Sequence, residues 1–194
     1  MTKKTDNANL GLKLRLRRHM LDRFHAAGEI RVFDACQADG VIWKNLRDEY
    51  GDRIASYWGV DLKPKRGRLK VDSIRVLQSG PMQENVIDID TYGMPWKHFE
   101  AACRNLDKPT TIFLTMGMPS IARNLSHDAT MCKLIGFGRL DPPIPLPGRA
   151  CWEFAANAML TVCCEHTKVV RAVTCRHVNG PASVQYFGVR VEPK

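Results

Sequence analysis

The sequence predicts an α/β fold with a mostly parallel, seven-stranded sheet that ends in an antiparallel hairpin. Segments typical of strands and of helices alternate along most of the chain, which favours a parallel sheet covered by helices on both faces. The last two predicted strands, 169–175 and 184–191, are joined through Asn179-Gly-Pro without a helix, so we expect them to pair antiparallel. The length of 194 residues, with 44% hydrophobic and 25% charged residues, suits one globular core.

Five further strands are expected before this hairpin. They are predicted at 29–34, 54–61, 69–72, 85–90 and 110–115, with helical segments at 41–50, 73–77, 96–105 and, after a proline-rich loop at 141–148, at 150–166. Ligands of an open α/β sheet lie at the carboxyl ends of its strands. Acids stand at three of these ends, Asp34, Asp61 and Asp90, so they mark the expected site.

The first 28 residues are predicted to form a basic helical extension, and residues 29–194 to form the main domain. From Asn9 to about His25, leucines are interleaved with lysines and arginines, and the later spacing is helical, which indicates a basic amphipathic helix. The polar start lacks the apolar region of a secretory signal, and no apolar stretch reaches the roughly 20 residues of a membrane span. We therefore expect a cytoplasmic protein without a membrane partner.

The segment Val32-Phe-Asp-Ala-Cys-Gln-Ala-Asp-Gly40 resembles the nucleotide loop of class I S-adenosylmethionine-dependent methyltransferases. After Asp34, the small residues Cys36, Ala38 and Gly40 stand where that family usually has three glycines. Small residues allow the backbone to pass close under a cofactor. The order of elements over residues 29–191 is also similar to the Rossmann-like fold of this family. The resemblance implies that S-adenosylmethionine is the cofactor.

Asp61 lies about twenty residues beyond this turn, where a carboxylate can accept both ribose hydroxyls of a nucleoside. By the same resemblance, Asp72 and Ser73 fall where the family contacts the adenine edge. A nicotinamide dehydrogenase would use the same turn and Asp61, but it requires G-x-G-x-x-G, which this loop lacks. The structural alternative for Asp61 is a cap at the end of a strand.

The segment Ile87-Asp-Ile-Asp-Thr-Tyr-Gly-Met-Pro95 resembles the catalytic motif of amino-methylating enzymes, Asp/Asn-Pro-Pro-Tyr/Phe. It is most similar to the Asp-x-Asp-Pro-Phe-Gly form of the tRNA guanine-N2 methyltransferases, with Thr91 in place of the proline. The resemblance implies that Asp90 accepts a hydrogen bond from an exocyclic amine and that Tyr92 stacks on the base. Asp88 should point to the same side of the strand as Asp90. A buried acid that caps the next helix is the alternative.

The formal net charge of +9 is concentrated in two basic clusters, which favours nucleic acid, RNA or DNA, as the partner. The predicted contacts are Lys13, Arg15, Arg17 and Arg18 near the N-terminus and Lys63, Lys65, Arg66, Arg68 and Lys70 in a loop. Two alternatives stay open. The clusters could form a solvated face, or the chain could be a catalytically inactive nucleic-acid-binding module that keeps a methyltransferase-like fold.

The seven cysteines include no C-x-x-C pair, so we expect reduced thiols of a cytosolic protein. The nearest approach to a metal cluster is formed by Cys163, Cys164, His166, Cys175 and His177. Because this group lacks the paired spacing of zinc ligands, no metal is predicted.

Overall fold

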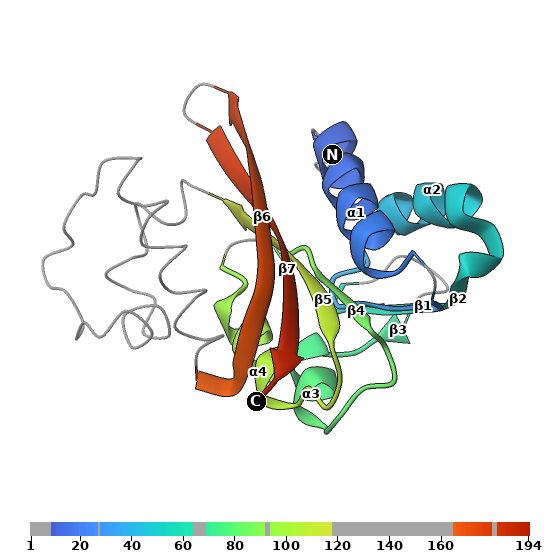
Figure 1. Cartoon of the computed structure of the whole chain (residues 1–194). Coiled ribbons are helices and arrows are strands. Elements are labelled where there is room, and N and C mark those ends of the chain that lie inside the picture. Colours follow the sequence, from blue (N-terminus) through green and yellow to red (C-terminus); the bar gives the residue numbers. More distant parts are fainter. Residues whose placement is uncertain (1–8, 27, 64–68, 92–93, 118–164, 180–181) are drawn as a thin grey trace, which may run out of the picture.

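Seven strands form a single sheet in the order β3-β2-β1-β4-β5-β7-β6 (Figure 1). The computed structural model describes residues 9–26, 28–63, 69–91, 94–117, 165–179 and 182–194. The strands are β1 (Ile30–Asp34), β2 (Ile54–Asp61), β3 (Leu69–Lys70), β4 (Val86–Ile89), β5 (Thr110–Gly117), β6 (Thr167–Asn179) and β7 (Ala182–Pro193). Strands β1 to β5 run parallel, and β7 pairs antiparallel with both β5 and β6. The predicted sheet and its closing hairpin are confirmed.

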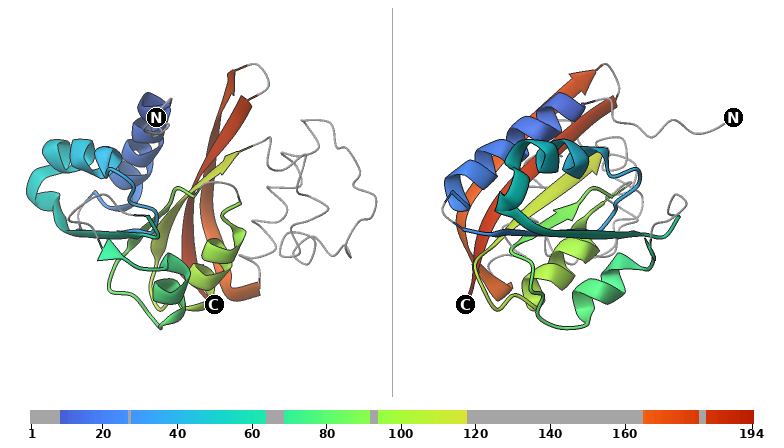
Figure 2. Two further views of the ribbon diagram at one scale, coloured as in Figure 1. Left: turned by 180° about the vertical axis from the view of Figure 1, so that it is seen from behind. Right: turned by 90° about the vertical axis from the view of Figure 1, so that its right-hand side faces the viewer.

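Helices cover both faces of this sheet, with α1 and α2 on one face and α3 and α4 on the other (Figure 2). They are α1 (Leu10–Phe24), α2 (Val41–Tyr50), α3 (Ser73–Gln78) and α4 (Trp96–Arg104), and a 3-10 turn (Gly51–Arg53) follows α2. Each pair of helices buries its own hydrophobic cluster against the strands. In the part of the chain described here, no helix combines the length and the apolar character needed to cross a bilayer. The predicted helix at 150–166 and the proline-rich loop at 141–148 fall almost wholly outside the described residues.

Strand β3 is shorter than the predicted strand at 69–72 because Asp72 starts the next helix instead. The Asp72 side chain accepts a hydrogen bond from the backbone N–H of Ile74 at 3.0 Å, which satisfies one of the unpaired donors at the start of α3. The strand therefore ends at Lys70, two residues earlier than expected.

Helix α1, which lies in the predicted N-terminal extension, packs against the sheet and contributes to its hydrophobic core. Its side chains Leu16, Met20 and Leu21 are buried in the cluster that also contains Tyr186 of β7. Gly188 of β7 allows this close packing, because a Cβ at that position would lie 2.8 Å from the Cγ of Met20. Its apolar stripe thus makes α1 part of the core.

Candidate functional site

Three carboxylates meet at the carboxyl ends of β1 and β4, beneath α1 and α2. Asp34 and Asp88 are register partners on these adjacent parallel strands, and both are buried. Their neighbours two residues earlier, Val32 and Val86, pack into the cluster under α1 and α2, so the acids face these helices. Asp90 follows one pleat later on the same side, as the sequence predicted for this pair.

Two cations from α1 neutralise two of these acids. Arg17 binds Asp88 through two hydrogen bonds, Nε to Oδ2 at 2.8 Å and Nη2 to Oδ1 at 2.6 Å. Lys13, one turn earlier, donates from Nζ to Oδ2 of Asp90 at 2.6 Å. Trp43 of α2 adds an indole N–H bond to Asp88 at 2.7 Å. Each buried charge of α1 is therefore paired, as buried charges in proteins almost always are.

The pKa values of Asp90 and Asp34 are shifted in opposite directions, because of these two acids only Asp90 forms an ion pair with a cation of α1. Burial would raise the pKa of Asp90, but the charges of Lys13 and Arg17 outweigh burial, so the pKa lies below its ordinary value. The pKa of Asp34 is raised well above its ordinary value, first by burial and then by the charge of Asp88. At neutral pH Asp90 is therefore an ionised acceptor, whereas the environment of Asp34 favours a bound proton.

The loop that follows β1 is held in an unusual backbone conformation. Ala38 has a φ of 43° and Gly40 a φ of 67°, and the left-handed region is readily occupied only by glycine. Gly40 donates its N–H to the carbonyl of Gln37 at 2.7 Å, and α2 begins at the next residue. Cys36 lies in the same loop and donates its N–H to Asp34 at 3.3 Å. The small residues predicted to line a cofactor loop are thus the ones that make this tight turn.

Asp61 connects this loop to the end of β2. Its Oδ2 accepts the backbone N–H of Ala38 at 3.0 Å, and its Oδ1 accepts the backbone N–H of Lys63 at 2.8 Å. An ionised carboxylate has about four lone-pair positions, so two further donors can be accepted. The carboxylate is thereby fixed beside the loop and keeps the capacity to bind a pair of hydroxyls.

Asp72 and Ser73 lie at the start of α3. This helix follows β3, the strand next to β2 on the side away from β1. Asp72 is the helix cap described above, and Ser73 is buried with its hydroxyl 3.0 Å from Nε2 of His98. Burial lowers the pKa of His98, which favours its neutral form. The structure therefore shows structural contacts for both residues.

The sequence did not single out several residues that build the site. Tyr57 of β2 donates its hydroxyl to Asp34 at 3.1 Å and accepts a bond from Gln37 at 2.8 Å, and Trp43 contacts Asp88 as described. The sequence does contain a pattern that indicates burial of Lys13 and Arg17. Both lie at helical spacing with Leu21, on the apolar stripe of α1.

Two of the residues assigned to the nucleic-acid surface are buried, which requires a correction. The side chains of Lys13 and Arg17 are 7% and 1% exposed, and both form ion pairs with carboxylates, so they are unavailable to phosphates. Arg15 is exposed, and Arg18 pairs with Glu49 at 2.8 Å near the surface. In the loop cluster Lys63 and Lys70 are exposed. Lys65, Arg66 and Arg68, like the predicted stacking residue Tyr92, lie outside the described residues.

A small cavity of about 30 Å³ lies between the residue 34–40 loop and the acids, and its lining includes Cys36, Gly40 and Asp90.

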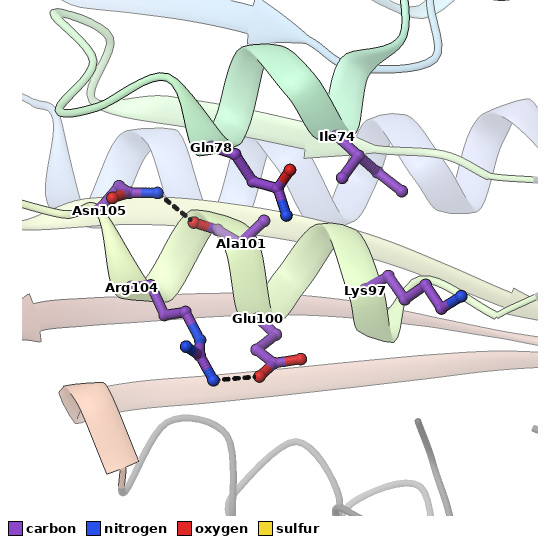
Figure 3. A pocket seen from close by; sticks show the side chains of 7 residues that line it. All are labelled: Ile74, Gln78, Lys97, Glu100, Ala101, Arg104 and Asn105. Atoms are coloured by element: carbon purple, nitrogen blue, oxygen red, sulfur yellow. Dashed lines mark hydrogen bonds and ion pairs between the residues drawn. The ribbon is translucent and has the colours of Figure 1, made fainter. Parts of the chain in front are cut away.

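A larger hollow of about 380 Å³ lies between α3 and α4 (Figure 3). It is lined by helix side chains that include the ion pair of Glu100 with Arg104 at 2.6 Å. Because ligands of this fold type lie at strand ends, we place the site at the acids. Glu100, Glu165 and His166 approach one another closely enough to hold a metal, but Glu100 already forms an ion pair with Arg104, so we assign none.

Comparison with known proteins identifies the fold. Trm1 from Pyrococcus horikoshii, solved with S-adenosyl-L-methionine, has a TM-score of 0.58 at 14% identity, covering 100% of this chain and 59% of that one. The N-methyltransferase NodS from Bradyrhizobium japonicum has a TM-score of 0.55 at 13% identity, covering 98% and 99%. The putative methyltransferase yhhF from Escherichia coli has a TM-score of 0.50 at 10% identity, covering 97% and 89%. No protein-family model and no curated protein sequence matches the chain. With the strand order, these similarities establish the Rossmann-like methyltransferase fold.

Proposed function

We propose that this protein is an S-adenosylmethionine-dependent methyltransferase that acts on an exocyclic amine of a base in RNA or DNA. The observation that supports it most is the convergence of the residue 34–40 loop, Asp61 and Asp90 at the carboxyl ends of β1, β2 and β4. Proteins of this fold have been solved with S-adenosyl-L-methionine and with S-adenosyl-l-homocysteine. The expected environment is the cytoplasm.

The residues at the ends of β1 and β2 fit such a cofactor. Asp61 is held by two backbone N–H groups and retains acceptor capacity for two ribose hydroxyls. The left-handed turn at Ala38 and Gly40 keeps small residues beside it. We assign Asp34, Cys36, Ala38, Gly40 and Asp61 to cofactor binding, and Asp72 and Ser73, which follow the terminal strand β3, to the adenine end.

Asp90 is the residue best suited to act on the amine. S-adenosylmethionine, when bound, supplies an electrophilic methyl group. The lone pair of an exocyclic amine is delocalised into the base, so an acceptor that holds its hydrogens helps to orient the nitrogen. Asp90 is ionised, partly exposed and adjacent to the cofactor-type loop. We assign Asp90 as the catalytic acceptor and Tyr92 as the stacking residue for a flipped base.

Replacing Asp61 by alanine should weaken cofactor binding strongly while the protein stays folded. The change removes one or two charge-assisted hydrogen bonds, each contributing about 1.5–3 kcal/mol. Isothermal titration with S-adenosylhomocysteine measures the loss, and titration with NADH tests the dehydrogenase alternative. The control is Asp48→Ala, which removes an exposed acid of α2. Equal affinity for S-adenosylhomocysteine in the folded Asp61→Ala and wild-type proteins would contradict the assignment.

The basic cluster beside Asp61 is the proposed nucleic-acid surface, with Arg15 and Arg18 of α1 extending it. Lys63 follows Asp61 closely in the chain and its backbone N–H bonds to that carboxylate, so the cluster begins at the proposed cofactor site. The neighbouring Lys65, Arg66 and Arg68 belong to the same cluster in the sequence. Exposed lysines and arginines can bind phosphates and release counterions.

Binding to RNA or DNA should therefore fall steeply as salt rises. Each neutralised phosphate contributes a log–log slope of about 0.9 on duplex DNA, and Lys63→Ala and Lys70→Ala should each reduce the slope by about one contact. Fluorescence anisotropy across a salt series measures this slope. Lys108→Ala is the control, because Lys108 lies before the amino end of β5, away from the carboxyl strand ends that carry the proposed site. Salt-independent binding, or no binding at low salt, would favour the solvated-face alternative.

A further inference from the structure

We propose that Lys13 and Arg17 are positioning residues for Asp90, the proposed acceptor of the amine hydrogens, so that docking of α1 on the sheet holds the Asp90 carboxylate in place. This inference rests on the proposed methyl transfer. It gives α1 a role in the reaction although the two cations do not reach the substrate themselves.

The two acids of β4 differ in accessibility. The Asp90 side chain is 19% exposed, whereas that of Asp88 is 2% exposed. Asp88 is already surrounded, because Arg17 and Trp43 donate three hydrogen bonds to its oxygens. Among the described residues, Asp90 forms its ion pair with Lys13, through Oδ2. Asp88 therefore anchors α1 to the sheet, and Asp90 is the acid that a substrate can contact.

Arg17 also stabilises the turn of the helix that carries Lys13. Its Nη1 donates to the backbone carbonyl of Lys13 at 3.1 Å, while its other nitrogens bind Asp88. Aromatic rings of the neighbouring strands contact both cations. The ring centroid of Phe113 lies 5.0 Å from Arg17 Cζ, and the ring centroid of Tyr186 lies 5.6 Å from Lys13 Nζ. The position of Lys13 Nζ against Asp90 is thereby fixed by contacts on several sides.

The charge arrangement explains why Asp90 needs these partners. The charged and titratable groups that face it are Lys13 and Arg17 from α1, Asp88 from its own strand, Asp34 from β1 and the Cys36 thiol from the loop. Without Lys13, burial would favour a proton on Asp90 and raise its pKa. A protonated carboxyl loses acceptor capacity for an amine hydrogen. The cation on α1 thus keeps the acceptor in its active form.

The test is an NMR titration of the Asp90 carboxyl carbon, together with the pH profile of methyl transfer. Both are measured in the wild type and in the variants Lys13→Met, Lys13→Arg and Arg23→Met. Lys13→Met should raise the Asp90 midpoint by roughly 1–3 pH units, the usual effect of a nearby opposite charge. Lys13→Arg keeps the charge and should stay close to wild type, as should Arg23→Met, which alters an exposed cation of the same helix. Lys13→Gln replaces Lys13→Met if the latter fails to fold, because it keeps a donor and removes the charge.

The acid limb of kcat should move upwards with the Asp90 midpoint in Lys13→Met, while the KM for S-adenosylmethionine stays unchanged. An unchanged Asp90 midpoint in Lys13→Met or Lys13→Gln overturns the positioning role, whatever the activity. A raised midpoint in a protein whose wild type transfers no methyl group overturns the proposed reaction, and the positioning role with it. The two failures are therefore distinguishable.

Discussion

Replacing Asp90 by alanine should abolish methyl transfer while leaving cofactor affinity nearly intact. Asp90 is the ionised acid at the end of the central strand, and its pKa is held below the ordinary value because Lys13 and Arg17 outweigh its burial. Loss of an acceptor that acts in the transition state costs about 10²- to 10⁴-fold in rate. Asp61 and the residue 34–40 loop are unchanged by the substitution, so the cofactor site should persist.

A tritiated-methyl transfer assay on total tRNA and genomic DNA measures this effect, with S-adenosylhomocysteine titration to check the cofactor site. Asp52→Ala, which removes an exposed acid after α2, is the matched control and should be fully active. Because Asp90→Ala leaves the Lys13 ammonium without its partner, thermal unfolding must show that the variant is folded at the assay temperature. Full activity in this variant would refute the assignment. No transfer by the wild type to any nucleic acid would favour the catalytically inactive binding module.

The Arg17→Met variant should be strongly destabilised. The Arg17 side chain is 1% exposed and forms a two-bond ion pair with Asp88, whose side chain is 2% exposed. Methionine fills similar space but leaves the Asp88 carboxylate buried without a cation, beside Asp34 and Asp90. Removing one partner of a buried ion pair costs about 3–5 kcal/mol in the free energy of unfolding.

Urea unfolding measures this loss, with Arg23→Met as the control on the same helix, expected to change stability by less than about 0.5 kcal/mol. The double variant Arg17→Met/Asp88→Asn should recover part of the stability, because it removes the unpaired charge as well as its partner. Wild-type stability in Arg17→Met would mean that the ion pair contributes little. The docking of α1 would then depend mainly on its apolar contacts with α2 and the sheet.

Much of the fold was predictable because local periodicity is strong in this chain. Helix α2 was predicted with the bounds that the structure shows, Val41–Tyr50, and β2 likewise at Ile54–Asp61. The apolar alternation and the clear turn residues around these segments leave few alternatives. Short elements were less well predicted: β3 ends at Lys70 because the capping bond of Asp72 begins α3 there, a competition that periodicity does not resolve.

The candidate site was predictable where it depends on strand ends. The acids Asp34, Asp61 and Asp90 could be located from the sequence because each closes an apolar strand run, and parallel strands bring their carboxyl ends to one edge of a sheet. The contacts of Tyr57 with Asp34 and of Asp61 with Ala38 depend on how β2 aligns with β1. No local pattern specifies that register.

The sequence by itself determined the succession along the chain of the strands and helices that the structure describes, the antiparallel hairpin at the end of the sheet and the acids at the carboxyl ends of its strands. Only the tertiary structure decided what the basic residues of α1 do. Lys13 and Arg17 were assigned to a nucleic-acid surface, but their partners, Asp90 and Asp88, lie 77 and 71 residues away in the chain. Such pairs form only when the sheet is complete and the helix packs across it, because the low-dielectric interior then requires each buried charge to be matched.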